Sequence, residues 1–244
     1  MKTKTVLITG VNGSIGSEIA TLFKRKGYIV CGIDQKDAQQ SIDHFFHFDL
    51  NKFVADPAYF EEWKTKLLFN IKDLDILVNN AAVQLLDSVN NIKLKDWQET
   101  LNVNLTAPLL LSKIFFSQLK ATNGCIINIA SIHQNLTKKN FVSYATSKSA
   151  LVGLTKAMAV DLQGDIRVNA ISPAAIATPM LLAGFDGNEN ALKELKSLHP
   201  VQRIGYPDEV AKLAFYIAND NKGFLHGSNI TLDGGISSVL HDIE

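Results

Sequence analysis

The stretch from Val6 to Gly16 constrains the fold more than any other part of the sequence. Val6-Leu7-Ile8 is a short apolar run, which is typical of a parallel strand buried on both faces. A glycine-rich turn follows it, and apolar residues then recur at helical spacing from Ile19 to Phe23. Glycines let the backbone approach a phosphate group and a helix N-terminus attracts its charge, so this pattern predicts a cradle for a dinucleotide.

Apolar runs and helical patterns alternate along the whole chain of 244 residues. Further strands are expected at 28–34, 44–50, 75–82, 125–131, 165–172 and 229–235, and long helices at 57–70 and 95–113. Right-handed crossovers then wind helices over both faces of a parallel sheet. We therefore expect a single α/β domain over residues 1–244: a doubly wound (Rossmann) parallel sheet of about seven strands, with its ligand crevice at the strand carboxyl ends. The segment at about 179–200 is typical of a substrate loop.

The amino-acid composition limits the classes of binding partner that we expect. Lys+Arg and Asp+Glu are 24 each, and no basic run is present, so a nucleic-acid partner is not expected. The apolar runs are too short to span a membrane. Cys31 and Cys125 lie in apolar runs, which predicts two buried, reduced thiols in a cytoplasmic protein. His44 and His47 point to opposite faces of a strand, so we expect no metal site.

Tyr144 and Lys148 are four residues apart in a helical pattern, which puts them on one face, one turn apart. An ammonium group beside a phenol favours the phenolate and would lower the pKa of Tyr144 toward the range of a general acid or base. A solvated helix pair would show the same spacing. Ser131 ends an expected strand 13 residues earlier, so the helix can bring hydroxyl and phenol together.

Asp34 ends the second expected strand, about 20 residues past the glycine turn, where a carboxylate can accept both ribose hydroxyls of a dinucleotide. The same carboxylate would repel a 2′-phosphate. An ordinary turn aspartate is the alternative. Asp49 and Leu50 end the third expected strand, where adenine would lie. Asn104 falls inside an expected helix, and solvent exposure is its default explanation.

These features together resemble the short-chain dehydrogenase/reductase family, over essentially the whole chain. Thr9, Gly10 and Gly16 resemble the family's cofactor turn, and Asn79-Asn80-Ala81-Ala82 resembles its Asn-Asn-Ala-Gly segment. The family's catalytic tetrad is matched in order by Asn104, Ser131, Tyr144 and Lys148, and its nicotinamide-side residues by Pro173 and Thr178. Three positions depart from the pattern, because glycine is usual where Ser14, Ala82 and Ala174 stand.

The resemblance implies hydride transfer between a nicotinamide ring and an alcohol or carbonyl carbon. Tyr144 would be the general acid/base, Ser131 would bind the substrate oxygen, Lys148 would lower the Tyr144 pKa and hold the ribose, and Asn104 would position a water. The expected cofactor-binding residues are Thr9, Gly10, Asn12, Ser14, Ile15, Gly16, Asp34, Asp49, Leu50, Asn80, Ala81, Ala82, Tyr144, Lys148, Pro173, Ile176 and Thr178. Asp34 favours NAD, whereas Lys36 leaves NADP possible.

The substrate is less specified by the sequence. The expected contacts are Gln84, Ser131, His133, Gln134 and Met180. Amide and imidazole groups suit a small hydroxylated substrate, such as a sugar or polyol, although they could equally be solvated loop residues. The rival activity is that of a 3-oxoacyl thioester reductase, and a rival of another class is a non-catalytic dinucleotide-binding or sensing protein. The resemblance also implies a homo-oligomer, a tetramer or a dimer.

Overall fold

The computed structural model describes residues 2–37, 42–185, 187–220 and 223–240. Its core is one sheet of seven parallel strands in the order β3-β2-β1-β4-β5-β6-β7. The strands are β1 (Thr5–Thr9), β2 (Ile29–Asp34), β3 (His44–His47), β4 (Ile76–Asn79), β5 (Cys125–Ile129), β6 (Arg167–Pro173) and β7 (Asn229–Leu232). The winding direction reverses between β1 and β4, where a doubly wound sheet forms its ligand crevice. The predicted fold class is confirmed.

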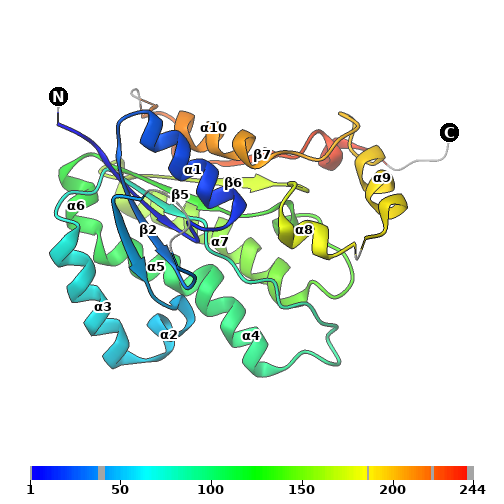
Figure 1. Ribbon diagram of the computed structural model, residues 1–244, viewed down its shortest axis with the longest axis horizontal. Helices are drawn as coiled ribbons and strands as arrows, with labels where there is room; N and C mark the ends of the chain where they lie inside the picture. Colours follow the sequence, from blue (N-terminus) through cyan, green and yellow to red (C-terminus); the bar gives the residue numbers. More distant parts are fainter. Residues whose placement is uncertain (1, 38–41, 186, 221–222, 241–244) are drawn as a thin grey trace.

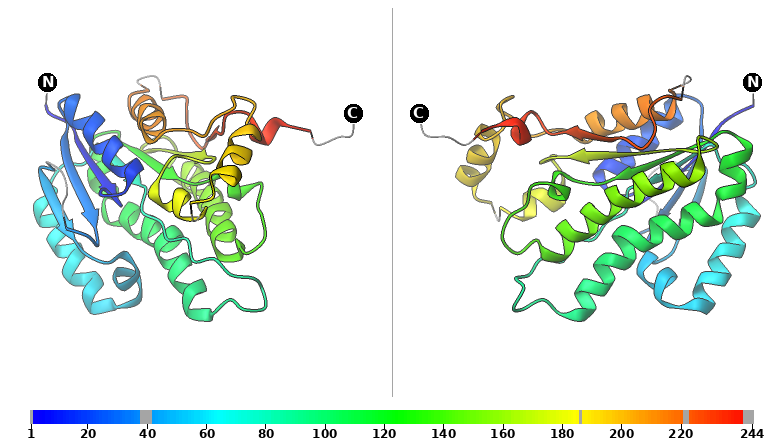
Figure 2. Two further views of the ribbon diagram at one scale, coloured as in Figure 1. Left: turned by 45° about the vertical axis from the view of Figure 1, so that its right-hand side comes forward. Right: turned by 180° about the vertical axis from the view of Figure 1, so that it is seen from behind.

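Helices cover both faces of the sheet (Figure 1). One face carries α1 (Ser14–Arg25) and α10 (Pro207–Ala218), which pack against each other. The other side carries α2 (Leu50–Ala55), α3 (Pro57–Asn70), α4 (Leu94–Leu101), α5 (Ala107–Ile114), α6 (Phe116–Ala121) and α7 (Val142–Leu162). Seen from behind, α7 lies alongside α4 and α5 (Figure 2). The short helices α8 (Pro179–Ala183) and α9 (Glu189–Ser197) lie beyond the carboxyl ends of the strands.

The third strand is shorter than the predicted 44–50 because a helix begins at its end. β3 stops at His47, and the Asp49 carboxylate accepts hydrogen bonds from the backbone N–H groups of Asn51 and Lys52. Asp49 is therefore the N-cap of α2. Asp56 caps α3 in the same way, with Pro57 in the first turn, so the chain turns twice within a few residues.

The helix predicted over 95–113 is interrupted. A π-helical turn, Asn102–Thr106, separates α4 from α5, and the Ala107 N–H donates to the Asn102 carbonyl five residues back. Pro108 follows and has no N–H to offer to the carbonyl of Asn104. The turn also rotates Asn104 inward, so its side chain is 1% exposed and the expected solvent exposure is wrong.

Cys31 and Cys125 are buried and unpaired, as predicted. Burial raises the pKa of Cys31 to about 12 and that of Cys125 to about 11, so both thiols stay protonated and weakly reactive at neutral pH. Over the described parts of the chain, the helices are too short or too polar to cross a membrane. Those same parts contain no cluster of three or more metal-ligating side chains.

Candidate active site

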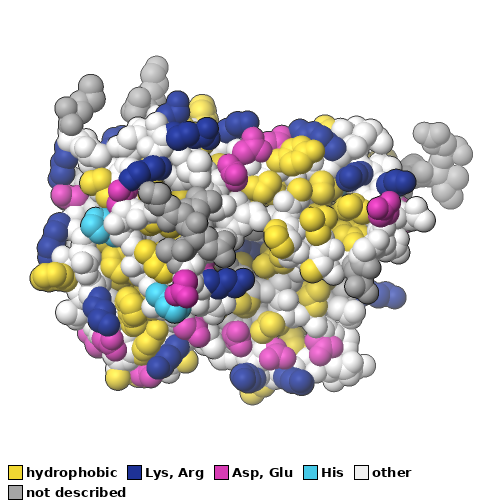
Figure 3. Space-filling model, in the orientation of Figure 1, with side chains coloured by type: hydrophobic (Ala, Val, Ile, Leu, Met, Phe, Trp, Pro, Cys, Tyr) yellow, Lys and Arg dark blue, Asp and Glu magenta, His cyan; other side chains and the backbone are white. Residues whose placement is uncertain are grey.

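A cleft of about 980 Å³ runs along the carboxyl ends of the strands. Asp34 lines one end and α8 and α9 line the other, with Ser131, Tyr144 and Lys148 between them. Hydrophobic side chains gather around α8 and α9 on the face shown in Figure 3. Among the predicted cofactor residues, the cleft is lined by Gly10, Asn12, Ser14, Ile15, Asp34, Asp49, Leu50, Asn80, Ala81, Ala82, Tyr144, Lys148, Pro173, Ile176 and Thr178.

Thr9 and Gly16 shape the glycine turn without lining the cleft. The Thr9 hydroxyl accepts hydrogen bonds from the backbone N–H groups of Asn80 and Ala81, each at 3.0 Å, and so ties the end of β1 to the end of β4. Gly10 has φ +64°, and a Cβ on Gly16 would lie 2.2 Å from the Gly10 carbonyl oxygen. Both positions therefore require glycine, whereas Ser14 begins α1 without strain.

At the other end of the turn, backbone amides hold the carboxylate of Asp34. Its two oxygens accept hydrogen bonds from the Asn12 N–H at 2.9 Å and from the Lys36 N–H at 3.0 Å. The Asn12 side chain donates in turn to the carbonyls of Lys36 and Asp37, at 2.9 and 3.0 Å. The carboxylate is thus fixed at the cleft wall with lone pairs left for further donors. Its distance along the chain from the glycine turn fits the ribose of a dinucleotide, and the cradle built by Gly10 and Gly16 fits the pyrophosphate.

Two hydroxyl groups meet in the middle of the cleft. The Ser131 hydroxyl lies near enough to the Tyr144 hydroxyl to lower its pKa, and the Ser131 oxygen accepts the backbone N–H of His133 at 3.2 Å. Because Ser131 is the N-cap of a short 3₁₀ turn, Ile132–Gln134, its rotamer is set by the backbone. A substrate oxygen placed between the two hydroxyls would meet one proton donor from each residue.

The predicted lowering of the Tyr144 pKa by Lys148 is not observed. The Lys148 Nζ donates to the Ile129 carbonyl at 2.8 Å and lies 5.7 Å from the centre of the Tyr144 ring. Burial raises the pKa of Tyr144 to about 12, opposed by the Ser131 hydrogen bond, and burial lowers the pKa of Lys148 to about 7. Desolvation therefore outweighs the attraction between the two groups.

Asn104 lies behind the cleft wall. Its Oδ1 accepts the Val83 N–H at 2.9 Å, and its Nδ2 donates to the Val83 carbonyl and to the Ser147 hydroxyl, each at 3.0 Å. Both amide protons are therefore used, and the second lone pair of Oδ1 is the part of the side chain left for the predicted water. Its observed contacts instead hold Val83, a residue that lines the cleft.

The substrate end contains some of the predicted residues and several that the sequence did not indicate. Gln84, His133 and Met180 line the cleft, but Gln134 does not, and its carbonyl accepts a hydrogen bond from Ser149. His133 stacks on Phe141 with ring centres 4.4 Å apart, and burial, helped by the Lys138 charge, lowers its pKa to about 4. The imidazole is therefore neutral at physiological pH. The unpredicted lining is mainly apolar: Leu86, Leu136, Phe141, Leu181, Phe185, Leu195, Leu198 and Ile236, together with His199.

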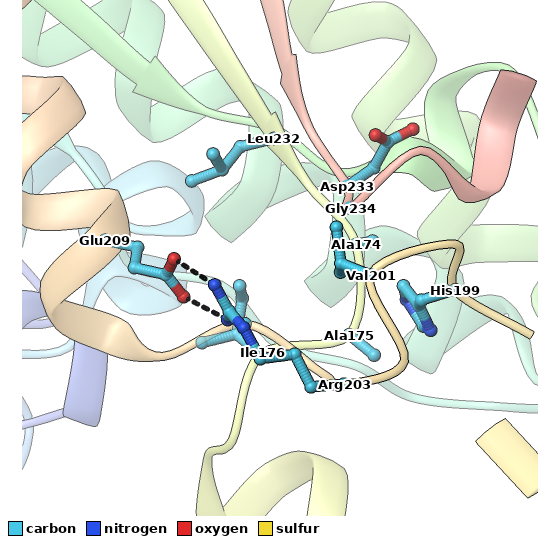
Figure 4. A pocket seen from close by; sticks show the side chains of 11 residues that line it. Ala174, Ala175, Ile176, His199, Val201, Arg203, Glu209, Leu232, Asp233 and Gly234 are labelled. Atoms are coloured by element: carbon cyan, nitrogen blue, oxygen red, sulfur yellow. Dashed lines mark hydrogen bonds and ion pairs between the residues drawn. The ribbon is translucent and has the colours of Figure 1, made fainter. Parts of the chain in front are cut away.

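A second cavity of about 130 Å³ lies beyond this end of the cleft, against the end of β7 (Figure 4). Arg203 and Glu209 form a bidentate ion pair across it, with both N–O distances at 2.8 Å. The paired guanidinium holds the pKa of Glu209 down at about 2. Most of the remaining lining is small or apolar, with His199 and Asp233 as its other polar side chains, so this cavity is a poor candidate for the reaction centre.

Comparison with known proteins agrees with this geometry. The model of the family described as "Enoyl-(Acyl carrier protein) reductase" matches residues 10–237. D-threitol dehydrogenase of Mycolicibacterium smegmatis is 32% identical, over 95% of this chain and 92% of its own. NAD-dependent glycerol dehydrogenase of Listeria innocua is 31% identical, over 95% of this chain and 93% of its own.

Solved structures of similar fold are also oxidoreductases or cofactor-binding proteins by their names. Ligand-free aldohexose dehydrogenase of Thermoplasma acidophilum has a TM-score of 0.91 and 28% identity, covering 100% of this chain and 97% of its own. ElxO, solved with NADP bound, has a TM-score of 0.86 and 29% identity, covering 98% of this chain and 100% of its own. With its cofactor cradle and its Ser131–Tyr144 hydroxyl pair, the chain belongs to the short-chain dehydrogenase/reductase family and is an NAD(P)-dependent oxidoreductase that interconverts alcohols and ketones.

Proposed function

We propose that this enzyme uses NAD to oxidise, and in reverse to form, a small polyol-like alcohol, with Tyr144 as the general acid/base. The observation that carries the proposal is the pair of hydroxyl groups, on Ser131 and Tyr144, that line the cleft and interact there. Relatives named for threitol and glycerol support the substrate class. A bound nicotinamide dinucleotide would supply the hydride acceptor or donor.

The roles of the side chains follow from their contacts. In oxidation, Tyr144 in its phenolate form takes the proton of the substrate hydroxyl. Ser131 holds the substrate oxygen and stabilises the charge that develops on it. Lys148 lies behind the ring with a pKa of about 7, so its ammonium is available near neutral pH to hold ribose hydroxyls and favour the phenolate. Asn104 is a positioning residue that acts through Val83.

Preference for NAD rests on Asp34. Two backbone N–H groups keep its carboxylate at the cleft wall, where it can accept ribose hydroxyls and repel a 2′-phosphate. Lys36 is exposed and also lines the cleft, and it is the group that could meet a 2′-phosphate instead. Measuring KM for both cofactors with one substrate tests the preference, and a lower KM for NADP would overturn it.

The experiment that tests the function is a substrate screen of the purified enzyme with NAD, in which the absorbance of NADH is followed. Threitol, glycerol, 2,3-butanediol and aldohexoses represent the proposed class, and acetoacetyl-CoA with NADPH represents the 3-oxoacyl thioester rival. We expect turnover of at least one polyol. Faster turnover of the thioester would favour the rival, which the description of the matching family model supports. NADH binding without turnover of any alcohol or ketone would favour a dinucleotide sensor.

We also propose that the chain forms a homo-oligomer through its helical face. Large apolar side chains are exposed on this face, including Leu94 on α4, Leu109 on α5 and Val160 on α7, with exposures of 79%, 43% and 78%. Exposed apolar area of this kind is typical of a subunit interface. Light scattering should give a dimer or tetramer, and a monomer at assay concentration would contradict this.

The buried, unpaired thiols support a reducing compartment, the cytoplasm.

A further inference from the structure

His199 follows α9 and is 2% exposed, packed near the turn after β7. Its Nδ1 lies 2.8 Å from the carbonyl oxygen of Leu195. A carbonyl oxygen can only accept a hydrogen bond, so Nδ1 carries a proton, and when the ring is neutral its Nε2 presents a lone pair. Among the residues that the structure describes, none donates to this Nε2.

The imidazole forms part of the wall between the large cleft and the small cavity, because it lines both. On the cleft side, the lining residues nearest to it in the chain, Leu195 and Leu198, are apolar and offer no side-chain donor. On the cavity side, Figure 4 shows the Arg203 guanidinium turned toward Glu209, on the far side from the imidazole. Neither side of the wall supplies the missing side-chain donor.

A second histidine, the half-buried His226 near β6, shows the contacts that are typical of a structural role. The Nδ1 of His226 accepts the Val168 N–H at 3.1 Å, and its Nε2 lies 2.8 Å from the Ala159 carbonyl. Both of its ring nitrogens are therefore paired within the fold. Buried polar groups are paired in the great majority of cases, so an unpaired acceptor at the wall of a binding cleft indicates that a ligand supplies the donor.

We propose that His199 is a specificity-determining residue whose Nε2 accepts a hydrogen bond from a second hydroxyl group of the substrate, apart from the hydroxyl that reacts at Tyr144. This inference rests on the proposed function and narrows it, since the preferred substrate must be at least a diol. A cleft that pairs a substrate hydroxyl discriminates strongly against an analogue without it, because its own polar group is then left unpaired.

The test compares kcat/KM for 2,3-butanediol with kcat/KM for 2-butanol, which has the same carbon chain and lacks the second hydroxyl. In the wild type the diol should be preferred. His199→Phe should lower the diol-to-monohydric ratio about 10- to 100-fold, and His199→Gln, which restores an oxygen acceptor, should recover part of it. His226→Phe is the matched control: it should lower thermal stability and leave the ratio unchanged.

A measurement on the wild type keeps the test independent of folding in the variants. The ¹⁵N resonance of the unprotonated Nε2 should move upfield when 2,3-butanediol is added to the enzyme–NADH complex, and 2-butanol should not move it. No shift with the diol, or an equal ratio in wild type and His199→Phe, would overturn the proposal. Failure of the proposed function looks different, because the wild type would then oxidise neither alcohol.

Discussion

Replacing Asn104 with alanine should loosen the cleft wall and the fold together. The side chain is 1% exposed and makes three hydrogen bonds, two of them to the backbone of Val83. The variant strands the Val83 N–H and carbonyl, and each stranded buried group costs about 1–3 kcal/mol. Because Val83 is only half-buried, water can reach it in part, so we expect a total loss of about 2–3 kcal/mol in the free energy of unfolding.

For a domain of this size that loss corresponds to a drop in Tm of about 4–12 °C, which calorimetry or thermal circular dichroism will resolve. Val83 lines the cleft, so kcat/KM should also fall, by about 10- to 100-fold. The matched control is Asn169→Ala. Asn169 is fully buried and makes the same kind of backbone bonds, to Leu225 and Ser228, but it lies outside the cleft lining.

Asn169→Ala should lose comparable stability and keep its kinetic constants. Equal kinetic losses in the two variants would show that Asn104 acts only through general stability. A wild-type Tm for Asn104→Ala would refute the argument from the Val83 hydrogen bonds.

Three further predictions test the cofactor end and the buried lysine. Asp34→Ser should raise KM for NAD about ten-fold or more and allow the enzyme to use NADP. Asp37→Ser, at a side chain that is 97% exposed, should change the KM for neither cofactor. Initial rates measured with both cofactors will show this. Gly16→Ala should abolish NADH binding in a fluorescence titration, because the added Cβ meets the Gly10 carbonyl oxygen at 2.2 Å. Gly153→Ala, with open space around the added Cβ, should instead raise the free energy of unfolding by up to about 1 kcal/mol. Burial lowers the pKa of Lys148 to about 7, so between that pH and the unfolded value near ~10.4 the unfolded chain binds the extra proton, and the contribution of Lys148 to stability rises with pH. The raised pKa values of Cys31 and Cys125 act in the opposite direction in any variant that keeps both thiols. Denaturant titrations at pH ~7 and ~9.5 should therefore give a more favourable change in stability for the wild type than for Lys148→Met, and equal changes in the two would contradict the assignment.

The number of strands and the position of the cleft at their carboxyl ends could be predicted because they depend on local patterns. Short apolar runs mark buried parallel strands wherever they occur, and the run before Gly10 starts the sheet as expected. Element ends were predicted less well. The apolar residues up to Leu50 extend the strand pattern, but the cap formed by the Asp49 carboxylate ends it at His47, and a cap is a matter of rotamer and backbone angle.

Contacts between distant segments account for what the sequence could not show. Asn104 is buried because its partner Val83 lies 21 residues earlier, on the strand exit that faces the π-helical turn. Spacing placed Tyr144 and Lys148 on one helix face, yet the lysine turns toward the Ile129 carbonyl on β5. The unpaired state of His199 could not be predicted either, because it depends on how α9, the turn after β7 and the cleft pack around the imidazole.

Tyr144→Phe tests the central claim most directly. The variant keeps the ring and its edge-on contacts with His133 and Phe141, and removes only the hydroxyl that interacts with Ser131. On the best polyol from the screen, kcat should fall by about 100- to 10,000-fold, while NADH binding, followed by fluorescence, stays at the wild-type level. A kcat close to that of the wild type, with NADH binding intact, would contradict the assignment of Tyr144 as the general acid/base.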